Sequence, residues 1–253
     1  MITGLLLSLT MLAVAADTNA PNTRGTVQYE MVNRLDLSME NVPKEFAAML
    51  PKEHRSGMVL YFTAANSLYE NLVTPQKESS EFSAAGENSN IRIEISNGGN
   101  EEKTYTELAT GRTVEQKEFM GKKFLISGSG EKLKWKISGR QKMLLDYPLQ
   151  EAIAITDKDT ITAWYTSRIP VAAGPMGING LPGLVLEASV GKNLTVTATA
   201  VTPGEDPGIK IKEPVKGKKV NPEQFKKIVQ EKEEEMKAQH GGEGVHINRV
   251  IVR

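Results

Sequence analysis

The sequence predicts a mainly β protein built on a single curved antiparallel sheet or half-barrel, with a short N-terminal helix and a C-terminal amphipathic helix. Apolar residues alternate with polar ones along several segments, as in strands that bury one face and expose the other. Polar outer faces favour antiparallel pairing, and clusters of Asp, Ser and Gly between the segments are typical of hairpin loops. The 253 residues are 39% hydrophobic and 25% charged, a composition typical of folded domains.

Five segments show the alternation clearly, and they are expected to form strands around residues 27–31, 58–62, 91–95, 133–137 and 195–200. Asp157-Lys158-Asp159 lies between two apolar runs and predicts a hairpin loop, and the Ser-Gly-Ser-Gly sequence at 127–130 predicts another before Leu133. We expect a meander of about nine to eleven strands.

Two helices are predicted beside the sheet. Residues 43–50 have a first-turn proline and helical apolar spacing, so they predict a short N-terminal helix. A longer amphipathic helix is predicted to start at Asn221 as N-cap, with Pro222 at its first position, and to stop at Gly241-Gly242. Its apolar face should contain Phe225, Ile228, Val229, Lys232 and Met236, and its Lys- and Glu-rich face should be solvated.

The start of the chain predicts export. Residues 2–16 are apolar or small and end in an Ala-x-Ala pattern before Asp17, although no Lys or Arg precedes them. The run is shorter than the roughly 20 residues of a membrane span. We therefore expect a signal peptide at 1–16, a β domain at 17–202, an extended linker at 203–219 and a helix with a tail at 220–253. The mature protein should be soluble and periplasmic or secreted.

Composition narrows the function. Lys plus Arg and Asp plus Glu each total 31, so no global basic charge attracts nucleic acid, and no nucleic-acid partner is expected. The absence of cysteine excludes disulfides, thiolate metal sites and a thiol nucleophile. No cofactor is predicted.

The most informative segment is 164–187, which is rich in proline and glycine between an aromatic and an apolar strand. Such a loop should have a constrained backbone. In Leu181-Pro182-Gly183-Leu184 the proline and glycine fit the two central positions of a type II turn, which predicts a positive φ at Gly183.

The string Gly180-Leu181-Pro182-Gly183-Leu184-Val185, preceded by Trp164-Tyr165-Thr166, Ile169-Pro170 and Gly174-Pro175, closely resembles the GLPGLI family of exported Bacteroidota envelope proteins. Members often have a cysteine where this chain has Leu149, so thiol chemistry proposed for relatives cannot operate here. The family has no established activity. Its strand pattern is similar to that of lipoprotein-carrier folds, and this likeness by itself implies no function.

The loop supplies the candidate ligand site, because aromatic rings beside a rigid loop can line an apolar cleft. The alternative is that these residues fill the core. The candidates are Trp164, Tyr165, Ile169, Pro170, Gly174, Pro175, Gly180, Leu181, Pro182 and Gly183.

The sequence indicates metal binding and catalysis less clearly than it indicates a ligand site in the loop. His240 and His246 are conceivable metal ligands, but the glycines between them would leave them unorganised. No common catalytic motif is present. Asp157 and Asp159 fit a hairpin loop better than a catalytic pair.

These observations predict a non-enzymatic exported protein whose curved sheet binds a lipid-like or other apolar ligand or an envelope partner. One alternative is a structural or assembly factor that acts on an outer-membrane protein complex through its edge strands or C-terminal helix. Another is a hydrolase with dispersed acidic residues.

Overall fold

The structure is a computed structural model that describes residues 22–34, 51–72, 78–86, 89–97, 102–129, 133–208 and 210–239. The predicted signal peptide at 1–16, the predicted helix at 43–50, and both His240 and His246 lie outside the described residues.

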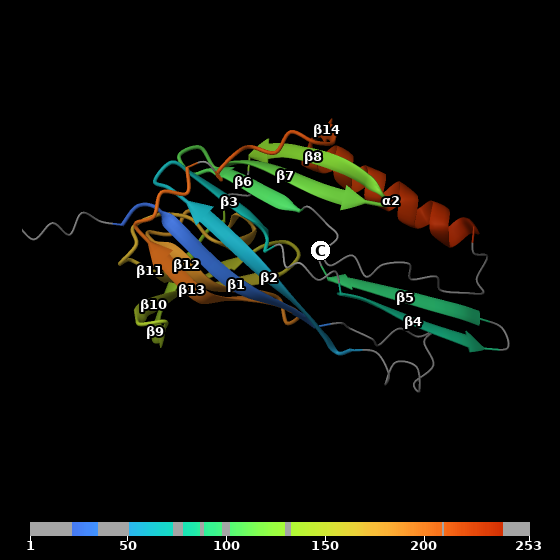
Figure 1. Cartoon of the computed structure of the whole chain (residues 1–253), viewed down its shortest axis with the longest axis horizontal. Helices are drawn as coiled ribbons and strands as arrows, with labels where there is room; N and C mark the ends of the chain where they lie inside the picture. The colour runs from blue at the N-terminus through green and yellow to red at the C-terminus, as the bar shows by residue number, and fades with distance from the viewer. Residues whose placement is uncertain are drawn as a thin grey trace, which may run out of the picture.

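Twelve strands form one open, curved sheet in the order β14-β8-β7-β6-β3-β2-β1-β13-β12-β11-β10-β9 (Figure 1). The mainly β prediction is therefore confirmed. The strands are β1 Gly25–Arg34, β2 Glu53–Phe62, β3 Asn66–Asn71, β6 Lys103–Glu107, β7 Arg112–Phe119, β8 Lys122–Ser129, β9 Lys136–Leu144, β10 Tyr147–Ile155, β11 Thr160–Thr166, β12 Leu184–Val190, β13 Leu194–Pro203 and β14 Lys218–Val220. A separate hairpin pairs β4 Glu78–Gly86 with β5 Ser89–Asn97.

Strand β1 joins two meanders, because it pairs with β2 on one side and with β13 on the other. Its alternation is the one predicted: Val27 and Tyr29 are buried, while Gln28 between them is not. The hairpin predicted around Asp157-Lys158-Asp159 is confirmed, since Ile155 pairs with Thr160 across it.

Two details at the β8 edge correct the sequence-based expectation. The sheet is mixed, because β14 pairs parallel to β8. Residues 127–129 belong to β8 and are not a hairpin loop; the chain reverses instead at Met120 and Gly121, both with positive φ. A Cβ at Gly128 would lie 3.0 Å from the Pro222 ring, so this glycine allows the start of the C-terminal helix to approach the strand closely.

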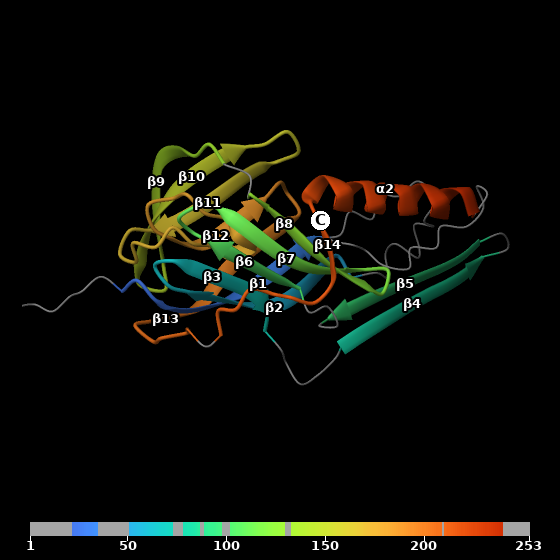
Figure 2. The ribbon, with the colours of Figure 1, turned by 90° about the horizontal axis from the view of Figure 1, so that it is seen from above.

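Helix α2, Pro222–Gln239, begins as predicted at Asn221. The Asn221 side chain accepts a hydrogen bond from the backbone N–H of Gln224 at 2.8 Å, and the Gln224 side chain accepts one from the backbone N–H of Asn221 at 2.9 Å. The Phe225 ring packs edge-on against Phe119 and Phe124, which secures the helix against β7 and β8. Figure 2 shows the course of α2 relative to these strands.

The loop between β11 and β12 crosses the inner side of the bent sheet. The backbone N–H of Leu184 donates to the carbonyl of Ile169 at 3.0 Å, and that of Val185 donates to Ala173 at 2.9 Å. A short 3₁₀ turn within the loop, η1 Pro175–Gly177, contacts β12 and also β3 and β6. The loop between β11 and β12 therefore packs against strands on both sides of β1.

Candidate functional site

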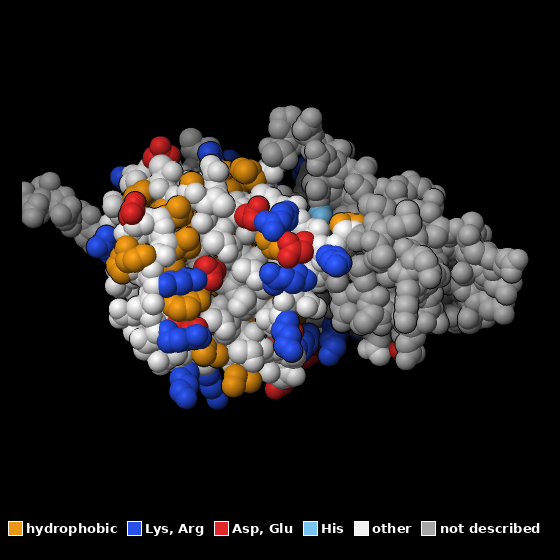
Figure 3. Space-filling model, turned by 90° about the horizontal axis from the view of Figure 1, so that it is seen from below, with side chains coloured by type: hydrophobic (Ala, Val, Ile, Leu, Met, Phe, Trp, Pro, Cys, Tyr) orange, Lys and Arg blue, Asp and Glu red, His pale blue; other side chains and the backbone are white. Residues whose placement is uncertain are grey.

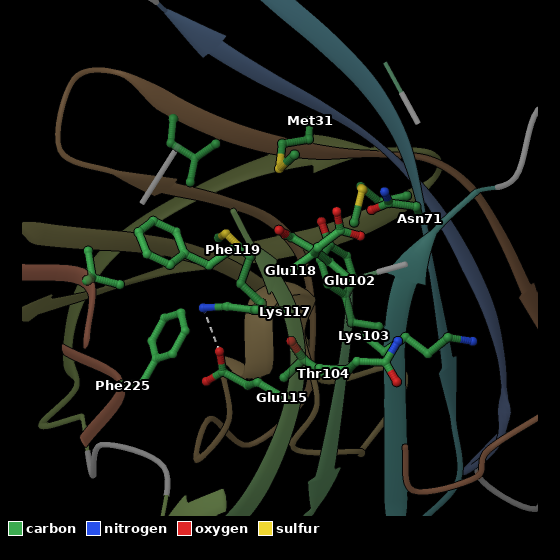
Figure 4. A pocket seen from close by; sticks show the side chains of 16 residues that line it. Met31, Asn71, Glu102, Lys103, Thr104, Glu115, Lys117, Glu118, Phe119 and Phe225 are labelled. Carbon is green, nitrogen blue, oxygen red and sulfur yellow. Dashed lines mark ion pairs between the residues drawn. The ribbon is translucent and has the colours of Figure 1, made fainter. Parts of the chain in front are cut away.

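A pocket of about 300 Å³ lies between the inner face of the sheet and α2 (Figure 4). Strands β1, β2, β3, β6, β7 and β13 contribute to its wall, together with η1 and α2. Most of its surface is apolar, and the apolar lining side chains are Met31, Met58, Tyr69, Phe119, Met176, Leu194, Phe225 and Val229. Such a lining can accommodate an uncharged, hydrophobic molecule.

Three of these side chains are methionines. Met31 and Met58 come from neighbouring strands, and Met176 comes from η1. Methionine is unbranched and polarizable, so it adapts to irregular or variable apolar partners. Met176 also has φ 56, a left-handed conformation that costs about 1–3 kcal/mol for a residue other than glycine. The packed loop holds this side chain at the pocket wall despite that cost.

Tyr69 is a polar group in this apolar wall. Its side chain is only 5% exposed, and its hydroxyl has no hydrogen-bond partner among the described residues. The neighbouring Tyr29, whose ring packs edge-on against it, donates its hydroxyl proton to the carbonyl of Val185 at 2.7 Å. Burial raises the pKa of Tyr69 above its ordinary value, so the phenol stays neutral and is available as a donor.

The charged groups in the pocket lining include two lysines with partners. Lys117 forms an ion pair with Glu115 at 2.6 Å, drawn in Figure 4, and Lys103 forms one with Glu70 at 2.6 Å. Both lysine charges are thus neutralised by the protein itself. A bound anion would have to compete with a carboxylate for either of them.

The predicted loop residues occupy other places. Tyr165, Ile169 and Leu181 are buried in the apolar core, and Trp164 is half-buried. Gly174, Pro175 and Gly183 are buried, whereas Pro170, Gly180 and Pro182 are exposed. None of these ten residues lines the described pocket, although Met176 from the same loop does. Their contact with a ligand stays a prediction.

Gly183 has a different role from the one predicted. The positive φ lies at Gly180, at 83°, and Gly183 is not among the residues with positive φ, so the predicted type II geometry is wrong. A Cβ at Gly183 would lie 2.2 Å from the carbonyl oxygen of Thr166. Glycine is required there because two backbone segments touch.

Trp164 lies in a row of charged residues across three neighbouring strands. It pairs in register with Glu151 on β10 and with Glu187 on β12. The Nζ of Lys142 lies 4.3 Å from the centre of its ring and 2.6 Å from a Glu187 carboxylate oxygen. This arrangement is a cation–π contact supported by an ion pair.

Glu151 is the buried member of this row and is only 1% exposed. Arg140 donates to its carboxylate from Nε at 2.7 Å, and Ser138 donates through its hydroxyl. Burial opposes ionisation, but these hydrogen bonds outweigh it and place the pKa of Glu151 below its ordinary value. The carboxylate therefore fixes the edge strand β9 to β10 and is not suited to donate a proton near neutral pH. The buried ion pair was not predicted from the sequence, because Arg140 and Glu151 lie on two different strands and no local spacing rule links them.

Two further properties concern metals and membranes. In the ranges that the structure describes, no three Asp, Glu or His side chains are grouped so that they could hold a metal ion. No helix within those ranges is long and apolar enough to cross a bilayer.

Comparison with known proteins gives a match to one family model over part of the chain and a likeness in fold to solved structures. The model of a family described as "Protein of unknown function (Porph_ging)" matches residues 100–187, which include the Gly180–Val185 motif. The GLPGLI name itself stays a prediction. No curated protein matches the chain.

Two solved structures, titled "Structure of PNGF-II in P21 space group" and "Structure of PNGF-II in C2 space group", resemble this chain with a TM-score of 0.50 each. Their sequences are 14% and 15% identical to it, and each match covers 81% of this chain and 33% of the other. This chain therefore spans about one third of their length. At this identity the likeness concerns the fold.

Proposed function

We propose that this chain is an exported, non-enzymatic protein that binds an apolar ligand in the pocket beneath α2. The observation that carries the proposal is the apolar, methionine-rich lining of a cavity of about 300 Å³. That volume is at the small end of the range for ligand sites, about 300–1,000 Å³. A short acyl chain or a compact hydrophobic molecule matches it in size and polarity.

Export rests on the sequence of residues 2–16, with their apolar run and Ala-x-Ala ending. An apolar molecule has low solubility in an aqueous compartment outside the cytoplasm, and a carrier shields it from water. A curved sheet covered by a helix provides such shielding, because both contribute apolar walls to one cavity.

The charged groups support binding in preference to catalysis. Lys103 and Lys117 at the pocket are held by Glu70 and Glu115, and Glu151 is held ionised on β10 by Arg140 and Ser138. A general acid or base needs a pKa close to the working pH, whereas the hydrogen bonds from Arg140 and Ser138 lower the pKa of Glu151 below its ordinary value.

The neutral fluorophore N-phenyl-1-naphthylamine tests the proposal. We expect saturable binding at one site and a fluorescence increase. Met31→Trp should weaken binding at least tenfold, because the larger ring occupies cavity space. The matched control is Met143→Trp, at a side chain that is 64% exposed on β9 and outside the pocket lining.

Circular dichroism and thermal melting should show that both variants keep the fold. Absence of saturable binding to the parent protein would contradict the proposal, and so would equal binding by folded Met31→Trp.

A second candidate, an assembly role on an outer-membrane protein complex, is favoured by the edge of the sheet. Strand β9 is the last strand, and Ile137 and Met143 on it are 48% and 64% exposed. On the face drawn in Figure 3, hydrophobic side chains are interspersed with Lys and Arg. A partner strand could pair with such an edge. A photo-crosslinker at position 143 should then capture one defined envelope protein, and a crosslinker at Lys158 should not.

A further inference from the structure

The hydroxyl of Tyr69 is a buried polar group whose hydrogen-bond partner is missing from the described chain. Within the described ranges, three buried hydroxyls share this property, those of Ser56, Tyr69 and Thr106. Tyr69 is the one of the three that lines the pocket. A buried donor without a partner costs about 1–3 kcal/mol, and native proteins retain such groups rarely.

The other groups around Tyr69 do not satisfy it. Its ring packs edge-on against Tyr29, whose own hydroxyl is committed to the carbonyl of Val185. The nearby wall contains the thioethers of Met31 and Met58, which are weak acceptors. Because the Tyr69 hydroxyl oxygen is itself buried, an acceptor on a molecule inside the pocket reaches it when the neighbouring lining side chains move aside.

The chemistry of the lining also selects the charge of that acceptor. A carboxylate or phosphate would need a cation, and both lysines of the lining already pair with glutamates. A phenol is a neutral donor, and placing an unpaired anion in an apolar cavity is costly. A neutral carbonyl oxygen needs one donor and no counter-charge.

We propose that the pocket selects a neutral acyl compound, an ester or amide of a short hydrocarbon chain, whose carbonyl oxygen accepts a hydrogen bond from Tyr69 while its chain contacts the methionines. This inference rests on the proposed function and names the ligand class for the same pocket. It separates three ligand types that an apolar cavity alone would not distinguish: a neutral ester, an alkane and a fatty acid anion.

Competition against bound N-phenyl-1-naphthylamine at pH 8 tests it with three probes of similar length: methyl octanoate, decane and octanoate. We expect methyl octanoate to displace the fluorophore about tenfold more effectively than either of the others. Tyr69→Phe should remove the preference for methyl octanoate over decane; the fluorophore affinity of each variant is measured first, and displacement is compared relative to it. Equal displacement by ester and alkane, or stronger displacement by octanoate, would overturn the inference.

Tyr29→Phe is the matched control, because it removes the hydroxyl that already has a partner. In the ligand-free protein, Tyr69→Phe should leave the melting temperature unchanged or raise it, whereas Tyr29→Phe should lower it. A drop in melting temperature for Tyr69→Phe equal to that for Tyr29→Phe would show that the hydroxyl has a partner within the protein, and the inference would fail.

The two failures can be told apart. If the fluorophore does not bind the parent protein, the proposed function fails and this inference fails with it. If the fluorophore binds but ester and alkane compete equally, the apolar pocket stands and the ligand class is wrong.

Discussion

The concave face of the sheet has two regions that are filled in different ways. One region is covered by the loop between β11 and β12, whose Ile169, Val171 and Ala173 pack into the main core. The other is covered by α2, which leaves a cavity of about 300 Å³ beneath it. The loop backbone thus packs directly on the sheet in one region, and α2 covers the sheet in the other.

The difference lies in how closely the covering segment can approach. In the loop region a Cβ at Gly174 would lie 2.8 Å from the Val185 side chain, and one at Gly183 would lie 2.2 Å from Thr166. In the α2 region the start of the helix approaches β8 closely at Gly128, but the next turn is held off by large side chains, with Phe225 against Phe119 and Phe124. The glycines let the loop backbone pack closely on the sheet, whereas the large side chains between α2 and the sheet hold them apart and leave the pocket. The Gly180–Val185 motif therefore allows the loop to pack closely against the sheet, and its residues do not line the pocket.

The largest expected effect is that of Gly183→Ala. The added methyl group would overlap the Thr166 carbonyl, and the backbone directly after Gly183 is held by the hydrogen bond from Leu184 to Ile169, so we expect a loss of about 3 kcal/mol or failure to fold. Urea denaturation measures the loss. Gly111→Ala is the control, because Gly111 has φ 72° but nothing within 4 Å of its Cβ position.

The control variant should lose only about 1 kcal/mol, the cost of the left-handed conformation. If the two variants lose equal stability, close approach is not the reason for glycine at position 183, and the contrast between the two regions disappears.

The sequence predicted what depends on neighbours along the chain. Alternation located β1, the aspartates located the β10–β11 hairpin, and Asn221 with Pro222 located the start of α2. These signals are local, because side-chain period, turn chemistry and capping each span a few residues.

What the sequence did not predict depends on contacts between distant segments. The role of Gly183 is set by the Thr166 carbonyl, 17 positions away, and strand β14 has three residues, too few for a period. The pocket brings together Met31, Phe119 and Val229 from strands and a helix far apart in the chain. No spacing rule joins those residues, so only the folded arrangement indicates a site there.

The smallest expected effect separates the two regions most directly. Asn221→Ala removes one hydrogen bond of the α2 cap, worth about 1 kcal/mol to the helix. Because α2 covers the pocket and not the loop, we expect N-phenyl-1-naphthylamine binding to weaken a few fold while the urea midpoint of the sheet changes little. Hydrogen exchange should show faster exchange in α2 than in β12.

Gln230→Ala is the control on the same helix, since Gln230 is exposed and its side chain bonds only to the exposed Glu234 among the contacts described. It should change neither binding nor the urea midpoint. If Asn221→Ala lowered the urea midpoint as much as Gly183→Ala, helix and loop would belong to one cooperative unit. The pocket would then be part of the core, because its roof could not loosen while the sheet stayed folded.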